Sequence, residues 1–176
     1  MRAPAAARPI PPDLPAKDAT VSASSVTPVL TSPAGLSVPD RLAVRLGHAG
    51  LVPFVLGALL AMLVRQDVLP YVVLSLSVYA GMIISFLGGI HWGLVMATRH
   101  SEPRHLVWAV VPSLLGWVSV VMPPHAGLVI QGLVLVVCYL VDRRAYPVFG
   151  LSRWLTLRFR LTLVASMSCF LAAARA

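Results

Sequence analysis

The chain has 176 residues, of which 58% are hydrophobic and only 11% are charged, and its mean hydropathy is +0.84. A soluble domain usually has about 45–50% apolar residues, so this composition excludes a soluble globular protein and requires lipid to cover part of the surface. The net charge of +8 comes from arginines that stand between apolar stretches, which favours membrane topology and contact with anionic lipid over nucleic-acid binding.

The N-terminal segment, residues 1–40, is rich in Pro, Ala, Ser and Thr. Such a composition cannot bury enough apolar surface to offset the entropy of ordering, so it predicts a disordered tail. Arg2, Arg8 and several serines also resemble a mitochondrial transit peptide, although the prolines would break an amphipathic helix. We prefer the interpretation as a flexible tail.

Five apolar stretches follow, separated by short turns that contain charged residues or proline. The predicted fold is therefore all-α: a polytopic membrane protein in which residues 41–176 form a bundle of five transmembrane helices behind the disordered tail. We expect the spans at residues 46–64, 69–98, 106–122, 126–141 and 155–174.

Small residues recur at every fourth position of the second span, and a matching series lies in the first. Lipid tails give helices no hydrophobic reason to associate, so close approach at small residues is a packing signal. The turn at 65–68 makes these two spans antiparallel neighbours, and we expect them to pack through these faces. The predicted helix-packing residues are Ala49, Pro53, Gly57, Ala61, Ser77, Gly81, Ser85, Gly89, Gly93 and Ala97.

His91 and Trp92 are candidate functional residues of the second span. His91 lies roughly 12 Å inside the boundary at Arg99, at about 1.5 Å per residue. It is also about 160° around the helix from Gly89, so it points away from the small-residue series. Ionisable groups at membrane depth are functional candidates, but both residues also fit the interfacial belt where Trp is favoured. Gln131 in the fourth span is a third candidate.

No pattern indicates a catalytic residue, a metal ligand set or a cofactor. Cys138 and Cys169 lie inside apolar runs without CxxC or Cys/His spacing, which leaves a zinc site unsupported. No Asp or Glu lies in the middle of a span, which argues against a carboxylate-driven carrier. Of the five histidines, His48 and His91 form the conceivable bis-histidine haem pair; the others are His100, His105 and His125.

Basic and aromatic residues gather in loop 142–154 and at the start of the fifth span. We expect their arginines to contact lipid headgroups, and Asp142 to pair locally with one of them. These arginines are Arg143, Arg144, Arg153, Arg158 and Arg160.

The arginines near the spans also predict the orientation. Only Arg65 and Arg175 lie on the side opposite the N-terminus, so the positive-inside rule predicts a cytoplasmic N-terminus and a periplasmic C-terminus. The side of the N-terminus holds Arg41, Arg45, Arg99, Arg104, Arg143, Arg144, Arg153, Arg158 and Arg160.

Several segments together resemble the bacterial family of domains of unknown function related to eukaryotic transmembrane protein 69. They are LGHAGLVPF (46–54), YAGMIISFLGGIHWG (79–93), VPSLLGW (111–117), LVDRRAY (140–146) and LRFRLTLVA (157–165). The resemblance covers about residues 42–174 and implies a small multi-span helical protein of the bacterial inner membrane. The eukaryotic relatives keep a mitochondrial inner-membrane location as the alternative. The resemblance implies no activity, cofactor or catalytic residue.

We expect a non-enzymatic membrane protein that packs within, or helps to assemble, a larger membrane complex. Its expected partners are the lipid bilayer, anionic headgroups and other membrane proteins, without nucleic acid. One alternative is a small-solute or proton conduit that uses His91 and a kink at Pro112. Another is a haem- or quinone-binding membrane protein.

Overall fold

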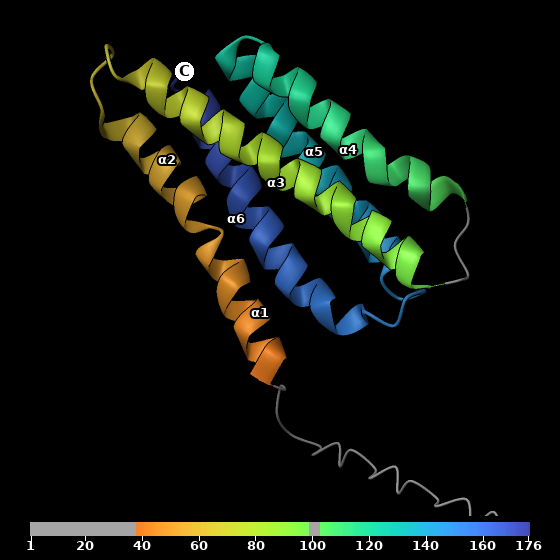
Figure 1. The fold of residues 1–176 in the computed structure, drawn as a ribbon. Coiled ribbons are helices and arrows are strands. Elements are labelled where there is room, and N and C mark those ends of the chain that lie inside the picture. The colour runs from red at the N-terminus through yellow and green to blue at the C-terminus, as the bar shows by residue number, and fades with distance from the viewer. Residues whose placement is uncertain (1–37, 99–102) are drawn as a thin grey trace, which may run out of the picture. The chain divides into compact units, whose positions relative to one another are not determined.

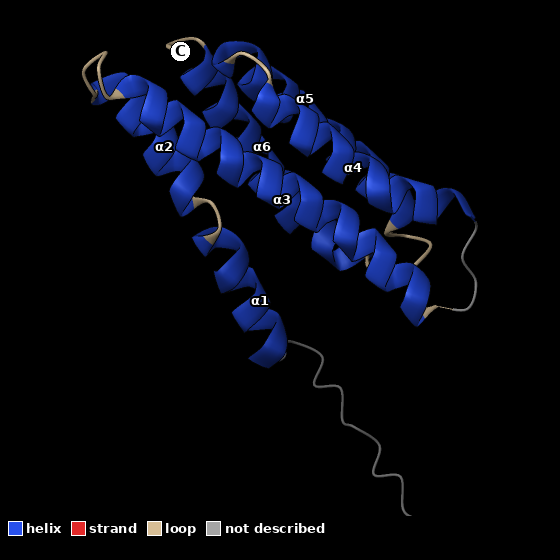
Figure 2. Ribbon diagram, turned by 45° about the horizontal axis from the view of Figure 1, so that its top comes forward, coloured by secondary structure: helices blue, strands red, loops and turns tan. Residues whose placement is uncertain are grey.

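The computed structural model describes residues 38–98 and 103–176, which belong to one compact unit, Leu36–Ala176. In this part of the chain the secondary structure is entirely helical (Figures 1 and 2). The predicted tail falls almost wholly outside the described residues, as do Arg99 and His100. The elements are α1 (Val38–Ala49), α2 (Val52–Leu63), α3 (Leu69–Ala97), α4 (Pro103–Val121), α5 (Pro124–Ala145), the 3-10 helix η1 (Ser152–Trp154) and α6 (Leu155–Ala173).

Five helical segments are long and apolar enough to cross a membrane, so the expected all-α membrane fold with five spans is confirmed. The first segment begins earlier than expected because α1 starts at Val38, inside the boundary given to the tail. The fourth continues past the expected end at residue 141, so Asp142 lies in a helix and not in a loop. The segments are Asp40–Leu63, Leu69–Ala97, Pro103–Val121, Pro124–Ala145 and Ser152–Ala173.

The first span is broken at Gly50 and Leu51, where α1 ends and α2 begins. Pro53 has no backbone N–H, so the ladder of helical hydrogen bonds cannot run unbroken through this point. The phenol of Tyr79 in α3 donates a hydrogen bond of 2.8 Å to the Gly50 carbonyl. A carbonyl at the break thereby gains a hydrogen-bond partner inside the bundle.

The long helix α3 is the centre of the bundle, because it contacts α2, α4, α5 and α6 (Figure 1). Its inward face presents Val73, Ile84 and Leu87, each at most 5% exposed, to the core. Leu128 and Leu135 of α5 complete the centre of that core at 1% exposure or less. The outward faces carry large apolar side chains, as expected for helices covered by lipid.

Helices α3 and α4 approach most closely at small residues seven positions apart. A Cβ atom on Gly88 would lie 2.5 Å from the Ala109 carbonyl oxygen, and one on Gly81 would lie 3.4 Å from that of Gly116. Pro112, inside α4, lies next to Gly88. Backbone-to-backbone contact of this kind is the usual way in which small residues join membrane helices.

The expected packing of the small-residue series of α3 against the first span is wrong. Gly81 faces α4, and nothing lies within 4 Å of the Cβ positions of Gly89 and Gly93. On a helix with about 100° per residue, each step of four residues advances about 40° beyond a full turn. Over the five steps from Ser77 to Ala97 the series therefore turns through about 200°, and it cannot stay on one face.

Helix α2 nevertheless lies beside α3 and meets it through other residues. A Cβ atom on Gly57 would lie 3.1 Å from the Leu76 side chain, and the rings of Phe54 and Tyr79 are 5.2 Å apart in an edge-to-face arrangement. Of the remaining residues expected at this interface, Ala61 is buried. Ala49, Pro53 and Ala97 are exposed, Ser85 is half-buried, and Ser77 is buried against α5.

Candidate functional site

His91 lies six residues before the end of α3, on the face that α3 turns towards α5 and α6. It is only 1% exposed, so its side chain is enclosed by the protein. Trp92, the next residue, points outward and is 46% exposed. The two neighbours therefore have different environments: Trp92 faces the lipid and His91 faces the protein interior.

A carboxylate and a guanidinium from two other helices meet His91 inside the bundle. The imidazole Nε2–H donates a 2.8 Å hydrogen bond to Oδ1 of Asp142, in the last turn of α5. Arg158, in the first turn of α6, donates to the other oxygen of the same carboxylate from Nε at 2.8 Å and from Nη2. The side chains of His91 and Asp142 are 2% and 3% exposed, and that of Arg158 is 12% exposed. These three residues are the buried network of the bundle.

Aromatic residues enclose this network at the end of the bundle. The ring of His105, from the first turn of α4, is stacked on His91 with an interplanar angle of 5° and a centroid distance of 6.5 Å. Phe149 covers His105 edge-on at 5.5 Å. Tyr146 is 4% exposed and lies near Asp142 and Arg158. Burial raises the pKa of the Tyr146 phenol, and the neighbouring Asp142 carboxylate raises it further, so the phenol stays neutral.

The buried network joins three helices through one carboxylate. Both carboxylate oxygens of Asp142 accept hydrogen bonds. Arg158 neutralises the charge of the carboxylate and binds one oxygen, and His91 binds the other. Within the described residues, Nδ1 of His91 is buried without a hydrogen-bond partner. His105, Trp108 and Arg144 line a hollow of about 390 Å³.

Gln131 ties α5 to α3 at a second level of the bundle. It is fully buried, and its amide nitrogen donates to the Ser77 carbonyl at 2.8 Å and to the Ser77 hydroxyl at 3.0 Å. Its amide oxygen is buried and has no partner among the described residues. The structure therefore places Gln131 in a polar contact between helices, apart from His91 and Trp92.

The arginines expected at lipid headgroups have three different environments. Arg143, Arg144 and Arg160 are exposed. Arg153 is exposed too but forms a two-pronged ion pair with Asp40, which connects η1 to the start of α1. The expectation that Arg158 contacts lipid headgroups is wrong, because its guanidinium turns inward to the buried carboxylate of Asp142. Asp142 does pair with one of these arginines, but across helices and not within its own loop.

The histidines do not form the haem pair that the sequence allowed. His48 is exposed, and its Nδ1 bonds the Val44 carbonyl of its own helix at 2.8 Å, whereas Nε2 of His91 is bound to Asp142. His125 is exposed near the start of α5. Within residues 38–98 and 103–176, no three His, Cys, Asp or Glu side chains are grouped so that they could hold a metal ion.

Sequence reasoning found His91 and expected Asp142 to pair with an arginine, but it did not connect this pair to His91 or place it inside the bundle. The signal for Asp142 was the apolar run before it, which carries no turn residue and therefore allows the helix to continue to the carboxylate. The signal for Arg158 was its place among the apolar residues of LTLRFRLTL, where a charge needs a partner. The aromatic cover by His105 and Phe149 had no comparable signal.

Comparisons with known proteins agree with this architecture. Residues 38–174 match the protein family described as "Protein of unknown function (DUF3429)". Transmembrane protein 69 of Xenopus tropicalis is 36% identical over 135 residues, which cover 72% of this chain and 51% of that protein. The chain thus spans about half the length of this curated relative. No solved structure matches the chain significantly.

Proposed function

Because this chain belongs to the protein family of unknown function DUF3429, we propose from its own surfaces that it is a non-enzymatic component or assembly helper of a larger membrane complex. The observation that carries the proposal is an open groove of about 510 Å³ between α3 and α4, with Ser85 and Gly116 in its lining. Beyond Ser85 the small-residue series turns by about 40° per step to Gly89 and Gly93, which have open space before them. The proposed occupant is a transmembrane helix of a partner protein, since small residues allow close approach of a helix backbone.

The arrangement of the interior supports a scaffold more than a conduit. The polar contact of Gln131 and the buried network at Asp142 are eleven positions apart on α5, about 16 Å at 1.5 Å per residue. Ile84, Leu87 and Leu135 are at most 5% exposed and occupy the core between these levels. An apolar layer of this kind offers no hydrogen-bonded path for a proton or a polar solute.

A non-enzymatic role is supported by the way the titratable groups are used. The carboxylate of Asp142 is enclosed by His91 and Arg158, which bind it from opposite oxygens. Groups that satisfy one another in this way stabilise helix packing. We therefore assign the buried network a structural role.

We place the protein in the bacterial inner membrane, with its N-terminus in the cytoplasm and its C-terminus in the periplasm. Helices that alternate in direction bring the start of α1, the end of α3 and the end of α5 to one end of the bundle (Figure 1). The exposed Arg143, Arg144 and Arg160 lie at that end, where they suit the anionic headgroups of a cytoplasmic leaflet. The mitochondrial inner membrane is the alternative location.

Crosslinking in native membranes tests the proposed partner. A photoreactive residue at Phe86, which lines the groove, should give a discrete crosslinked product that mass spectrometry identifies as another membrane protein. The double change Gly89→Leu and Gly93→Leu should remove this product, whereas Ala49→Leu, at an exposed site on α1, should not. Purification as a monomer without a crosslinked partner would contradict the proposal.

A further inference from the structure

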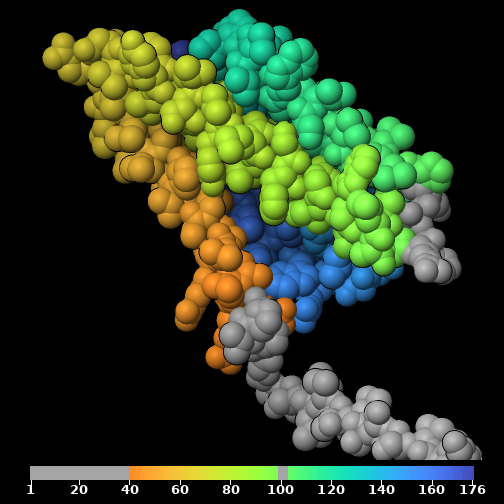
Figure 3. All heavy atoms as spheres, viewed as in Figure 1, coloured from red at the N-terminus to blue at the C-terminus, as the bar shows by residue number. Residues whose placement is uncertain are grey.

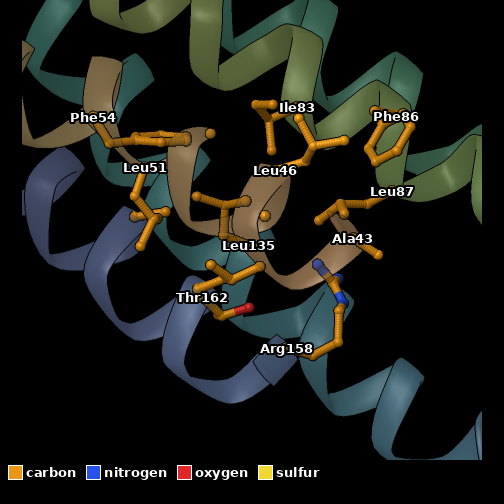
Figure 4. A pocket seen from close by; sticks show the side chains of 14 residues that line it. Ala43, Leu46, Leu51, Phe54, Ile83, Phe86, Leu87, Leu135, Arg158 and Thr162 are labelled. Atoms are coloured by element: carbon orange, nitrogen blue, oxygen red, sulfur yellow. The ribbon is translucent and has the colours of Figure 1, made fainter. Parts of the chain in front are cut away.

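A pocket of about 310 Å³ lies beside the break in the first span. Figure 3 shows α6 at the floor of a hollow between α1 and α3, and Figure 4 shows the side chains around it. The lining comes from five helices and is almost entirely apolar, with Phe54, Leu87 and Leu135 among its walls. The break makes room for it, because Gly47 and Gly50 contribute no side chain to the lining.

Arg158 is the charged residue of the lining, and it stands at one end of the pocket (Figure 4). A guanidinium carries five N–H donors. Asp142 receives hydrogen bonds from Nε and Nη2. The guanidinium therefore has N–H donors left for a ligand in the pocket. The other polar side chain that lines the pocket is that of Thr162.

The end of the pocket at Arg158 favours a ligand with negative charge. Arg41 and Arg45 of α1 are exposed and do not line the pocket, so Arg158 is the cation that a ligand inside it would meet. The acidic residue of α1, Asp40, is paired with Arg153. The guanidinium of Arg158 can form charge-assisted hydrogen bonds with a carboxylate or a phosphate.

The walls of the pocket favour a ligand with an apolar chain. Leu46 and Phe86 line it and are 62% and 64% exposed, so the pocket opens sideways into the surrounding lipid. Its volume is at the lower end of the range of roughly 300–1,000 Å³ that is usual for ligand pockets. That size suits one chain better than two.

We propose that this pocket binds a single-chain amphiphile with an anionic head, such as a fatty acid or a lysophospholipid, with the head at Arg158 and the chain along the walls. The pocket shares Phe86 with the groove between α3 and α4, but Arg158 and the other lining residues do not line the groove. The proposal therefore does not depend on the proposed role in a membrane complex. The anionic head of the ligand would also contact the buried network, because Arg158 binds Asp142.

The test uses the full chain in phosphatidylcholine nanodiscs with a diazirine derivative of palmitic acid as the probe. Mass spectrometry should locate the label in peptides around residues 43–54 and 158–165. Unlabelled palmitic acid should compete at least about tenfold better than methyl palmitate, which has the same chain without the charge. Lysophosphatidic acid is the second competitor, and its strength relative to palmitic acid identifies the preferred head.

Two matched variants locate the site. Ala43→Phe should fill the pocket from an exposed position and lower labelling about tenfold, while Leu42→Phe, at the neighbouring position outside the lining, should leave it unchanged. Arg158→Lys should reduce the preference for the acid over the ester. Equal competition by acid and ester, or full labelling of Ala43→Phe, would overturn the proposal, because either result means general lipid contact.

Discussion

His91 and Asp142 are 51 positions apart in the sequence and are joined by a 2.8 Å hydrogen bond inside the bundle. Arg158 binds the same carboxylate from a third helix. A charge enclosed in this way stabilises the fold only while its partners are complete, because a buried ion that loses its partner cannot be solvated. The energetics of the bundle should therefore be sensitive to each member of this network.

Replacing Asp142 with Asn should destabilise the protein by about 3–5 kcal/mol, since it leaves the Arg158 guanidinium without a counter-charge. Unfolding in mixed micelles with increasing SDS measures the change. The double variant Asp142→Asn with Arg158→Gln should lose less stability than the sum of the single variants, because the two residues interact directly.

The control is Asp67→Asn, which breaks an ion pair with Arg65 whose side chains are 66% and 88% exposed. An exposed pair of this kind contributes less than about 1 kcal/mol. If Asp142→Asn and Asp67→Asn reduced stability by similar amounts, the buried network would contribute no more to stability than an exposed ion pair.

The neighbouring glycines Gly88 and Gly89 should respond in opposite ways to substitution by alanine. A Cβ atom on Gly88 would meet the Ala109 backbone at 2.5 Å, so Gly88→Ala should force α3 and α4 apart at a cost of about 1–3 kcal/mol. Nothing lies near the corresponding position of Gly89, and Gly89→Ala should be neutral or stabilising by up to about 1 kcal/mol. Thermal unfolding in detergent compares the two, and a larger loss for Gly89→Ala would contradict the α3–α4 packing.

Tyr79→Phe should loosen the break in the first span. The substitution keeps the ring contact with Phe54 but removes the hydrogen bond to the Gly50 carbonyl, at a cost of about 1 kcal/mol. Hydrogen–deuterium exchange should become faster for the amides near Gly50. Tyr71→Phe, at a side chain that is 74% exposed, serves as the control and should leave the exchange unchanged. Unaltered exchange in Tyr79→Phe would mean that the break does not need this bond.

Alkaline phosphatase fused after Ala176 should be active in a bacterial host, because the proposed orientation places the C-terminus in the periplasm. The same reporter inserted at Gly150, in the connection between α5 and η1, should be inactive. The reverse pattern of activity would invert the orientation.

The five spans could be predicted from the sequence because lipid imposes a simple requirement, a long apolar helix with few charges, that each apolar stretch meets by itself. The neighbours of each helix could not be predicted in the same way. The series of Ser77, Gly81 and Gly89 suggested one packing face, but the helical twist turns it from α5 past α4 to the lipid.

The site was predictable only in part for the same reason. His91 was noticed because it is ionisable at membrane depth, a property of its own span. Asp142 and Arg158 lie at the ends of apolar runs, where a charge also fits a loop or a headgroup layer. The side chains of Asp142 and Arg158 point inward because α3, α5 and α6 meet there. The pattern of a single apolar stretch does not predict which helices meet.

The spacing of the buried network also orders events during biosynthesis. At about 5–20 residues per second, the ribosome adds Asp142 about 3–10 seconds after His91, and Arg158 later still. During this interval the chain contains all of α3 but not the carboxylate that His91 binds. Every newly made chain therefore passes through a stage at which the polar face of α3 lacks its partners, and the synthesis of α5 and α6 ends that stage.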